Sequence, residues 1–224
     1  ILAHVFNGLL KKALPLLFPD ITYSFYPVFC QLYDIDFKEI PLKDDLSIDL
    51  ADYEVPNGGI IFPNPNAPTG RLLAIGEIEH LLKANRNSVV VIDEAYVDFG
   101  GQSSIGLLTD NPNLIVTQTM SKSRSMAGMR IGFALGSADL IKGLERVKNS
   151  FNSYPLGHLQ IAAGISAIED SDHFKDTCQR VIHNRAKLTI KLEELGFSVI
   201  PSAGNFVLVR HFRASALEIY GQLK

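Results

Sequence analysis

The sequence contains no tryptophan, only three methionines and only two cysteines, Cys30 and Cys178. The two cysteines lie far apart and form neither a CxxC pair nor a disulfide ladder, which is typical of a reducing compartment. Residues 1–14 lack the basic start and cleavage site of a secretory leader. We therefore expect a cytoplasmic protein.

Long apolar runs and an excess of one charge are also missing. No apolar run approaches the roughly 18 residues of a membrane span, which predicts no membrane insertion. The net charge of −3 gives no electrostatic reason to expect nucleic acid as a partner. The six histidines lack the spacing of metal ligands, so we expect no metal.

The sequence instead shows alternating helical and strand patterns along its 224 residues. Apolar periodicity predicts helices at 1–14, 23–32, 75–84, 138–148, 157–195 with a break near 170–172, and 214–223. Short apolar runs predict strands at 60–62, 89–92, 114–117 and 129–135. Because the first and last segments read as helices already under way, we expect neighbouring segments of the fold to be missing.

This alternation predicts an α/β fold, a mostly parallel sheet sandwiched by helices. The β-branched run at 89–92 is typical of a strand buried on both faces. A soft boundary near 149–155 predicts a large domain at 1–150, followed at 151–224 by connecting helices and part of a smaller α+β domain. Ligands of such sheets bind beyond the carboxyl ends of the strands, so polar residues just after a strand are the candidates.

Two chemically capable residues follow predicted strands. Asp93 ends the strand 89–92, and Lys122 follows the strand 114–117 with Thr119, Ser121 and Arg130 near it in sequence. Two hydroxyls and a guanidinium are suited to holding a phosphate. A lysine beside a phosphate favours phosphoryl transfer or Schiff-base chemistry, although a helix cap and a surface charge are the simpler readings of Asp93 and Lys122.

Phosphoryl transfer is disfavoured by the glycine pattern. The sequence has no GxxxxGK[ST] loop, no kinase-type glycine loop and no dinucleotide-binding fingerprint. A third element is the loop 64–70 (NPNAPTG). Its two prolines and its glycine predict a rigid loop, in which a cis X-Pro bond is plausible.

The order of these elements resembles the signature series of fold-type-I aminotransferases. The series runs from 64–70 through Asp93–Tyr96 and Lys122 to Arg130. Within that group, the sequences DEAYVDF (93–99), SKSRSMAGMRIGFA (121–134) and FNSYP (151–155) are similar to the histidinol-phosphate aminotransferase family. The similarity covers essentially the whole chain, and it implies pyridoxal 5′-phosphate as cofactor and the large domain of the fold-type-I transferases.

The resemblance implies catalytic roles for two residues. Lys122 would carry the cofactor as a Schiff base and act as the general acid and base at the substrate Cα. Asp93 would pair with the pyridine nitrogen and keep it protonated, so that the ring accepts the electrons of the carbanion.

The resemblance also implies which residues bind the cofactor. Tyr23 would stack on the ring face, and Tyr96 would hydrogen-bond to the phenolic oxygen of the ring. Thr119, Ser121 and Arg130 would bind the phosphate.

The sequence departs from the family pattern at two places. The asparagine that usually precedes Pro-Thr-Gly and contacts the ring oxygen is Ala67 here, so either Asn66 takes over this contact or Tyr96 serves alone. The family's phosphate-binding Gly-Ser loop and its C-terminal arginine are not found in this sequence.

The resemblance therefore implies an enzyme of histidine biosynthesis with small-molecule substrates. It would convert histidinol phosphate and 2-oxoglutarate into imidazole acetol phosphate and glutamate, as a homodimer. An aromatic or broad-specificity aminotransferase is the alternative among enzymes. A non-catalytic aminotransferase-like module is the alternative outside them.

Overall fold

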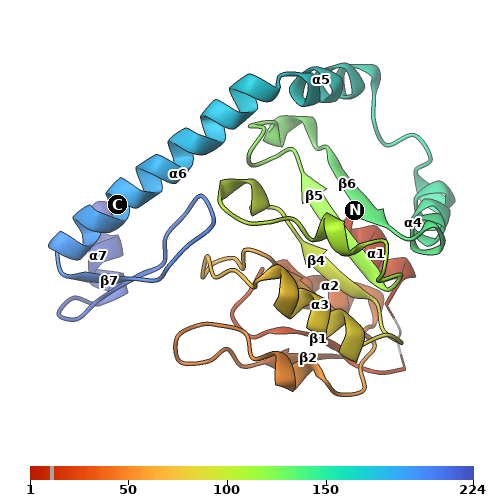
Figure 1. The fold of residues 1–224 in the computed structure, drawn as a ribbon, viewed down its shortest axis with the longest axis horizontal. Helices are drawn as coiled ribbons and strands as arrows, with labels where there is room; N and C mark the ends of the chain where they lie inside the picture. Colours follow the sequence, from red (N-terminus) through yellow and green to blue (C-terminus); the bar gives the residue numbers. More distant parts are fainter. Residues whose placement is uncertain (11–12) are drawn as a thin grey trace.

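The computed structural model describes residues 1–10 and 13–224 and is built around a six-stranded sheet (Figure 1). The strands are β1 (Leu16–Pro19), β2 (Phe37–Ile40), β3 (Gly59–Pro63), β4 (Val90–Asp93), β5 (Leu114–Thr119) and β6 (Gly132–Gly136), in the spatial order β2-β1-β3-β4-β5-β6. Neighbouring strands pair in parallel except for β5 and β6, which are antiparallel. The predicted mostly parallel sheet is confirmed.

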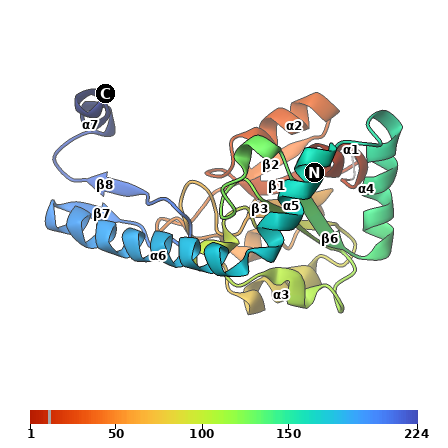
Figure 2. The same ribbon diagram turned by 90° about the horizontal axis from the view of Figure 1, so that it is seen from above.

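Helices cover both faces of this sheet (Figure 2). The helix α3 (Ile75–Ala84) covers one face, and the helices α1 (Leu2–Gly8), α2 (Phe25–Tyr33) and α4 (Ala138–Phe151) cover the other. Along β3, Ile60 and Phe62 belong to the first core and Ile61 to the second. This alternation explains why the central strands read as continuous apolar runs, since each face of the sheet needs its own buried side chains.

Several predicted elements begin or end elsewhere. The first helix was expected to span 1–14 but ends at Gly8, which packs closely against Val147 of α4; residues 11 and 12 of that prediction lie outside the described residues. The strand expected from residue 129 begins only at Gly132, because Ala127–Met129 form a 3₁₀ turn (η4) and Arg130 has a left-handed φ of 55°. The close packing at Gly8 and the positive φ of Arg130 both depend on the folded structure, and hydrophobic periodicity does not reveal them.

The rest of the chain continues from α5 (His158–Glu169) into the long helix α6 (Ser171–Glu194), which leads away from the sheet (Figure 1). The predicted break between them is confirmed at Asp170, whose carboxylate accepts a hydrogen bond from the His173 N–H. Two short antiparallel strands, β7 (Phe197–Val199) and β8 (Val209–His211), and the helix α7 (Ala216–Leu223) complete the chain. The division into domains at residue 150 stays a prediction.

No helix within the described residues combines the length and the apolar character needed to cross a membrane.

Candidate active site

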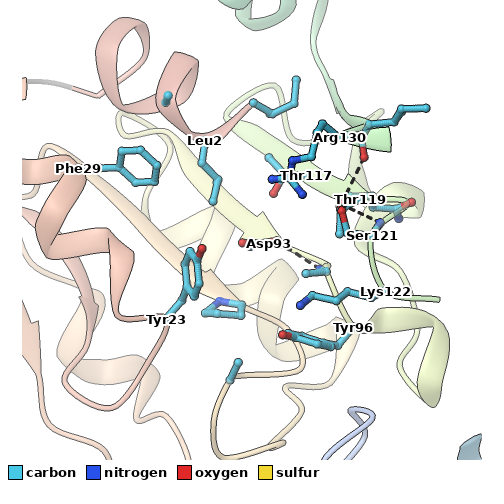
Figure 3. A pocket seen from close by; sticks show the side chains of 18 residues that line it. Leu2, Tyr23, Phe29, Asp93, Tyr96, Thr117, Thr119, Ser121, Lys122 and Arg130 are labelled. Carbon is cyan, nitrogen blue, oxygen red and sulfur yellow. Dashed lines mark hydrogen bonds between the residues drawn. The ribbon is translucent and has the colours of Figure 1, made fainter. Parts of the chain in front are cut away.

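A cavity of about 430 Å³ lies at the carboxyl ends of β4 and β5, where the fold class places ligands (Figure 3). Every predicted site residue except Asn66 lines it: Tyr23, Asp93, Tyr96, Thr119, Ser121, Lys122 and Arg130. These side chains come from the segment just before α2, from the end of β4 and the loop after it, and from the end of β5 and the segment that follows it. The sheet thus brings together residues that are about 100 positions apart in sequence.

Asp93 ends β4 and is only 9% exposed. Its Oδ1 accepts a hydrogen bond from the Ala95 N–H (3.2 Å), and its Oδ2 accepts one from the Tyr26 hydroxyl (3.4 Å). Burial raises the pKa of the Asp93 carboxyl to about 6, although both hydrogen bonds favour the ionised form. A buried carboxylate facing a cavity is suited to a cationic or proton-bearing nitrogen.

Lys122 lies in a short segment that internal hydrogen bonds hold in shape. The Thr119 hydroxyl accepts from the Ser121 N–H (3.1 Å) and donates to the Ser121 hydroxyl (3.0 Å), and the Met120 N–H donates to the Ile131 carbonyl (3.1 Å). The Nζ of Lys122 lies 5.2 Å from the centre of the Tyr96 ring. The amine is therefore directed along the cavity wall that Tyr96 forms, where it can reach a ligand.

Arg130 adds a guanidinium at the opposite end of this segment. Its Nη1 donates to the Ala127 carbonyl (2.9 Å), the one hydrogen bond of this guanidinium within the part of the chain that the structure describes. The other N–H groups are available to an anion beside the hydroxyls of Thr119 and Ser121. This donor set is suited to a phosphate group.

Thr117 is a cavity residue that the sequence did not single out. It pairs in register with Asp93 and is only 3% exposed; its hydroxyl lowers the pKa of the Asp93 carboxyl but makes no hydrogen bond of good geometry among residues 1–10 and 13–224. A buried hydroxyl without a partner is costly unless a ligand supplies one. Its position inside a predicted strand gave no signal, because a threonine in a strand is ordinarily structural.

Glu94 is a second residue without an assigned role at the sequence level. Its buried carboxylate accepts hydrogen bonds from the Ser103 hydroxyl (2.6 Å), the Ser104 N–H (2.5 Å) and the Gln118 side chain (2.8 Å). These bonds fix the segment that carries Tyr96 against β5. The two carboxylates of the motif Asp-Glu-Ala-Tyr therefore differ in position: Asp93 lies at the cavity, and Glu94 holds the loop in place.

Asn66 does not line the cavity, so the geometry does not support the prediction that it replaces the asparagine missing at Ala67. Its amide nitrogen donates to the Ile21 carbonyl (2.9 Å) and the Thr69 hydroxyl (3.1 Å), and its oxygen accepts from the Thr22 hydroxyl (3.0 Å). Asn66 thereby ties its own loop to the segment before Tyr23. Ala67 lines the cavity instead, and the bonds Asn64–Pro65 and Ala67–Pro68 are both cis.

The C-terminal part of the chain also reaches this region. Phe206 packs edge-on against the Tyr96 ring with 5.0 Å between ring centres, and the Ala203 N–H donates to the Gly70 carbonyl (2.9 Å). Arg185 of α6 donates to the carbonyls of Phe99 (2.8 Å) and Gly204. The wall formed by Tyr96 is therefore supported by contacts from residues about 90 to 110 positions later in the chain.

No cluster of three or more His, Cys, Asp or Glu side chains suited to a metal ion occurs in the described residues. The chemistry of the cavity is that of an amine, a buried carboxylate, aromatic rings and a phosphate-type donor set.

Known proteins are similar to this chain in sequence and in fold. The sequence model of the family aminotransferase class I and II matches residues 2–223. Histidinol-phosphate aminotransferase 1 of Pseudomonas fluorescens is 57% identical over 224 residues, which cover 100% of this chain and 64% of that protein. The chain thus spans less than two thirds of the length of this relative.

Solved structures agree on the fold. The histidinol-phosphate aminotransferase of Clostridium acetobutylicum matches with a TM-score of 0.90 and 23% identity, over 99% of this chain and 68% of that one. The histidinol-phosphate aminotransferase of Sinorhizobium meliloti, solved in complex with pyridoxal 5′-phosphate, matches with a TM-score of 0.84 and 23% identity, over 95% of this chain and 59% of that one.

Proposed function

Because this chain belongs to the aminotransferase class I and II family, we propose that it forms the core of a pyridoxal-phosphate-dependent aminotransferase. The proposed reaction converts histidinol phosphate and 2-oxoglutarate into imidazole acetol phosphate and glutamate. The names of the relatives over the whole chain support this substrate. The observation that carries the proposal is one cavity lined by a lysine amine, a buried aspartate and a phosphate-type donor set.

The residues of the cavity fit this cofactor at both of its ends. The buried carboxylate of Asp93 would face the ring nitrogen, next to the Thr117 hydroxyl. Tyr23 would lie against the ring face, and Tyr96 would donate a hydrogen bond to the ring oxygen. The phosphate would be held by the remaining donor set, Thr119, Ser121 and Arg130.

Lys122 would act as the catalytic residue. Its amine would hold the cofactor covalently and would then move the proton at the substrate Cα. When bound, the cofactor supplies an electron sink for the carbon that is deprotonated. Burial of Asp93 supports this role of the ring, because a carboxylate in a dry site interacts more strongly with a protonated nitrogen than it would in water.

The decisive variant is Lys122→Ala. The chain, and a version extended at both ends to the length of its relatives, would each be mixed with pyridoxal phosphate and examined for a visible absorbance band. We expect a band that borohydride reduction converts into a stable adduct on the peptide containing Lys122, and we expect its complete loss in Lys122→Ala. Lys142→Ala is the control, since that side chain is 72% exposed on α4.

A band that persists in Lys122→Ala, or an adduct on another lysine, would overturn the proposed anchor. No band in either version of the wild-type protein would favour the non-catalytic module.

The substrate is tested by comparing amino donors. We expect kcat/KM for histidinol phosphate to exceed that for phenylalanine or tyrosine by about 100-fold or more, because a phosphate recognised by charged donors contributes several kcal/mol of binding. Comparable values would favour the alternative of an aromatic or broad-specificity aminotransferase.

We also propose that the protein acts as a homodimer in the cytoplasm. The helix α2 supports an assembly, because Phe25, Val28 and Leu32 expose apolar side chains at 47%, 45% and 66% beside the cavity residue Tyr23. The two free cysteines, Cys30 and Cys178, are buried and agree with a reducing compartment. Analytical ultracentrifugation would measure the oligomeric state.

A further inference from the structure

Tyr26 is a buried tyrosine directly behind the cavity. Its side chain is fully buried in the second core, although it does not itself line the cavity. Phe6 and Phe18 lie around its ring, with 6.1 Å and 5.8 Å between ring centres. These neighbours are apolar, so they explain an aromatic ring at this position but not a hydroxyl on it.

The hydroxyl of Tyr26 has one hydrogen-bond partner within the described chain, the Asp93 carboxylate at 3.4 Å. A buried hydroxyl costs free energy unless it is bonded, and phenylalanine would fill the same space without that cost. Burial and the charge of Asp93 hold the pKa of Tyr26 well above its usual range, so this group is a neutral donor at every working pH. Its effect on the site is therefore exerted through Asp93.

Tyr26 also contacts a second residue that lines the cavity, Tyr23. Its ring packs edge-on against Tyr23, with 5.5 Å between ring centres and an interplanar angle of 81°. One buried side chain thus touches both Tyr23 and Asp93. In the proposed function these two residues would contact the ring face and the ring nitrogen of the cofactor.

We propose that Tyr26 is a positioning residue that orients the Asp93 carboxylate and keeps it ionised toward the cavity. The contacts of Tyr26 do not depend on the proposed function, but the purpose assigned to them here rests on it. A hydrogen bond donated to a carboxylate favours the ionised form, which opposes the effect of burial. The same bond fixes which oxygen of Asp93 faces Tyr26, leaving the other side of the carboxylate to the Ala95 N–H and the cavity.

Other groups also act on Asp93 and have to be held constant in a test. Those that lie near it or line the same cavity are Thr117, whose hydroxyl also lowers the pKa of Asp93, Glu94, Tyr23, Tyr96, Lys122, Arg130 and the amino group of Ile1. Tyr26→Phe removes a single oxygen atom and leaves all of them in place. Tyr53→Phe is the matched control, because Tyr53 is equally buried but lies in the first core, where its hydroxyl has no partner among the described residues.

The first measurement is the pH at which Asp93 ionises in the cofactor-free chain, followed by NMR of labelled aspartate carboxyl carbons. We expect the midpoint to move upward by about 0.5 to 1 pH unit in Tyr26→Phe and to stay unchanged in Tyr53→Phe. The second measurement is the affinity for pyridoxal phosphate, which we expect to fall about 3- to 10-fold in Tyr26→Phe only.

An unchanged Asp93 midpoint in Tyr26→Phe would overturn the proposal, and so would an equal shift in Tyr53→Phe. If Tyr26→Phe proved too unstable to titrate, it would be measured at lower temperature with added osmolyte, alongside Tyr26→Leu, which removes the ring as well. Equal Asp93 midpoints in the two variants would assign the effect to the hydroxyl. A midpoint shift confined to Tyr26→Leu would overturn the proposal. If the wild-type chain bound no pyridoxal phosphate, the proposed function would fail, while the midpoint comparison without cofactor would still decide the role of Tyr26.

Discussion

At Asp93, burial opposes ionisation of the side chain. Folding places its carboxylate among apolar strands, which raises its pKa to about 6, compared with about 3.9 for an aspartate in an unfolded chain. The folded state therefore binds the proton more tightly than the unfolded state does. By linkage, the stability associated with this group is fully present below about pH 4 and declines as the pH rises to about 6.

Asp93→Asn should remove this decline in the cofactor-free chain. We expect the free energy of unfolding of the wild type to fall by about 2 to 3 kcal/mol between pH 4 and pH 7 from this group, and the variant to lack that part of the slope. Urea unfolding at several pH values would measure it. Asp44→Asn, at an exposed position, should leave the wild-type slope intact; an equally steep slope in Asp93→Asn would contradict the prediction.

Among the elements, the segment after β5 is held from two sides. Ser123 donates to the Asp98 carboxylate (2.5 Å), which joins the segment to the loop after Tyr96. Arg124 donates to the carbonyl of Ala167 near the end of α5, and its guanidinium carbon lies 3.9 Å from the centre of the Phe174 ring on α6. Lys122 is therefore presented by a segment that is connected both to the loop after Tyr96 and to the following helices.

Arg124→Ala should loosen this connection. Loss of a hydrogen bond to a helix C-terminus and of a stacked guanidinium is expected to lower the free energy of unfolding by about 1 to 3 kcal/mol. Thermal and urea unfolding would measure it. Arg180→Ala on α6 is the comparison, because its side chain is 76% exposed and its carboxylate partner is 3.9 Å away; similar losses in both variants would show that Arg124 contributes no more than a surface charge.

On the scale of the whole molecule, Arg185 connects the C-terminal part of the chain to the cavity wall. Its guanidinium bridges the carbonyls of Phe99 and Gly204, next to the contact between Phe206 and Tyr96. Gly70 has a φ of 77° and lies so close to Ser202 that an added Cβ would overlap it. The two parts of the chain therefore meet at backbone carbonyls and at a glycine, where there is little tolerance for displacement.

Arg185→Ala should release the segment 200–206 from Tyr96. Because a charge-assisted hydrogen bond contributes about 1.5 to 3 kcal/mol, we expect amide hydrogen exchange in 200–206 to accelerate by about 10-fold or more. Exchange followed by mass spectrometry would measure it. Lys187→Ala, at an exposed position on the same helix, should leave these amides unchanged; unchanged exchange in Arg185→Ala would show that other contacts hold the segment.

The sequence by itself determined the class of the sheet and most of the elements. The helix α3 was predicted with its observed bounds, because its apolar side chains recur at helical spacing and its ends are marked by neighbouring loops. Asp93 and Lys122 were identified because parallel strands gather their carboxyl ends at one edge, a rule that needs no coordinates. The strands β1 and β2 were not among the predicted strands; in β2, three of the four residues are exposed and carry no apolar run.

Only the tertiary structure decided which polar side chains face the cavity. Asn66 was a predicted site residue and Thr117 was not, yet the fold uses the amide of Asn66 in loop contacts and places Thr117 at the cavity. Tyr26 reads as an ordinary apolar position of a helix, and its hydroxyl acquires a role only because β4 ends beside it. The physical reason is that periodicity specifies the buried face of an element, whereas a hydrogen bond depends on the distance between two atoms that are far apart in the sequence.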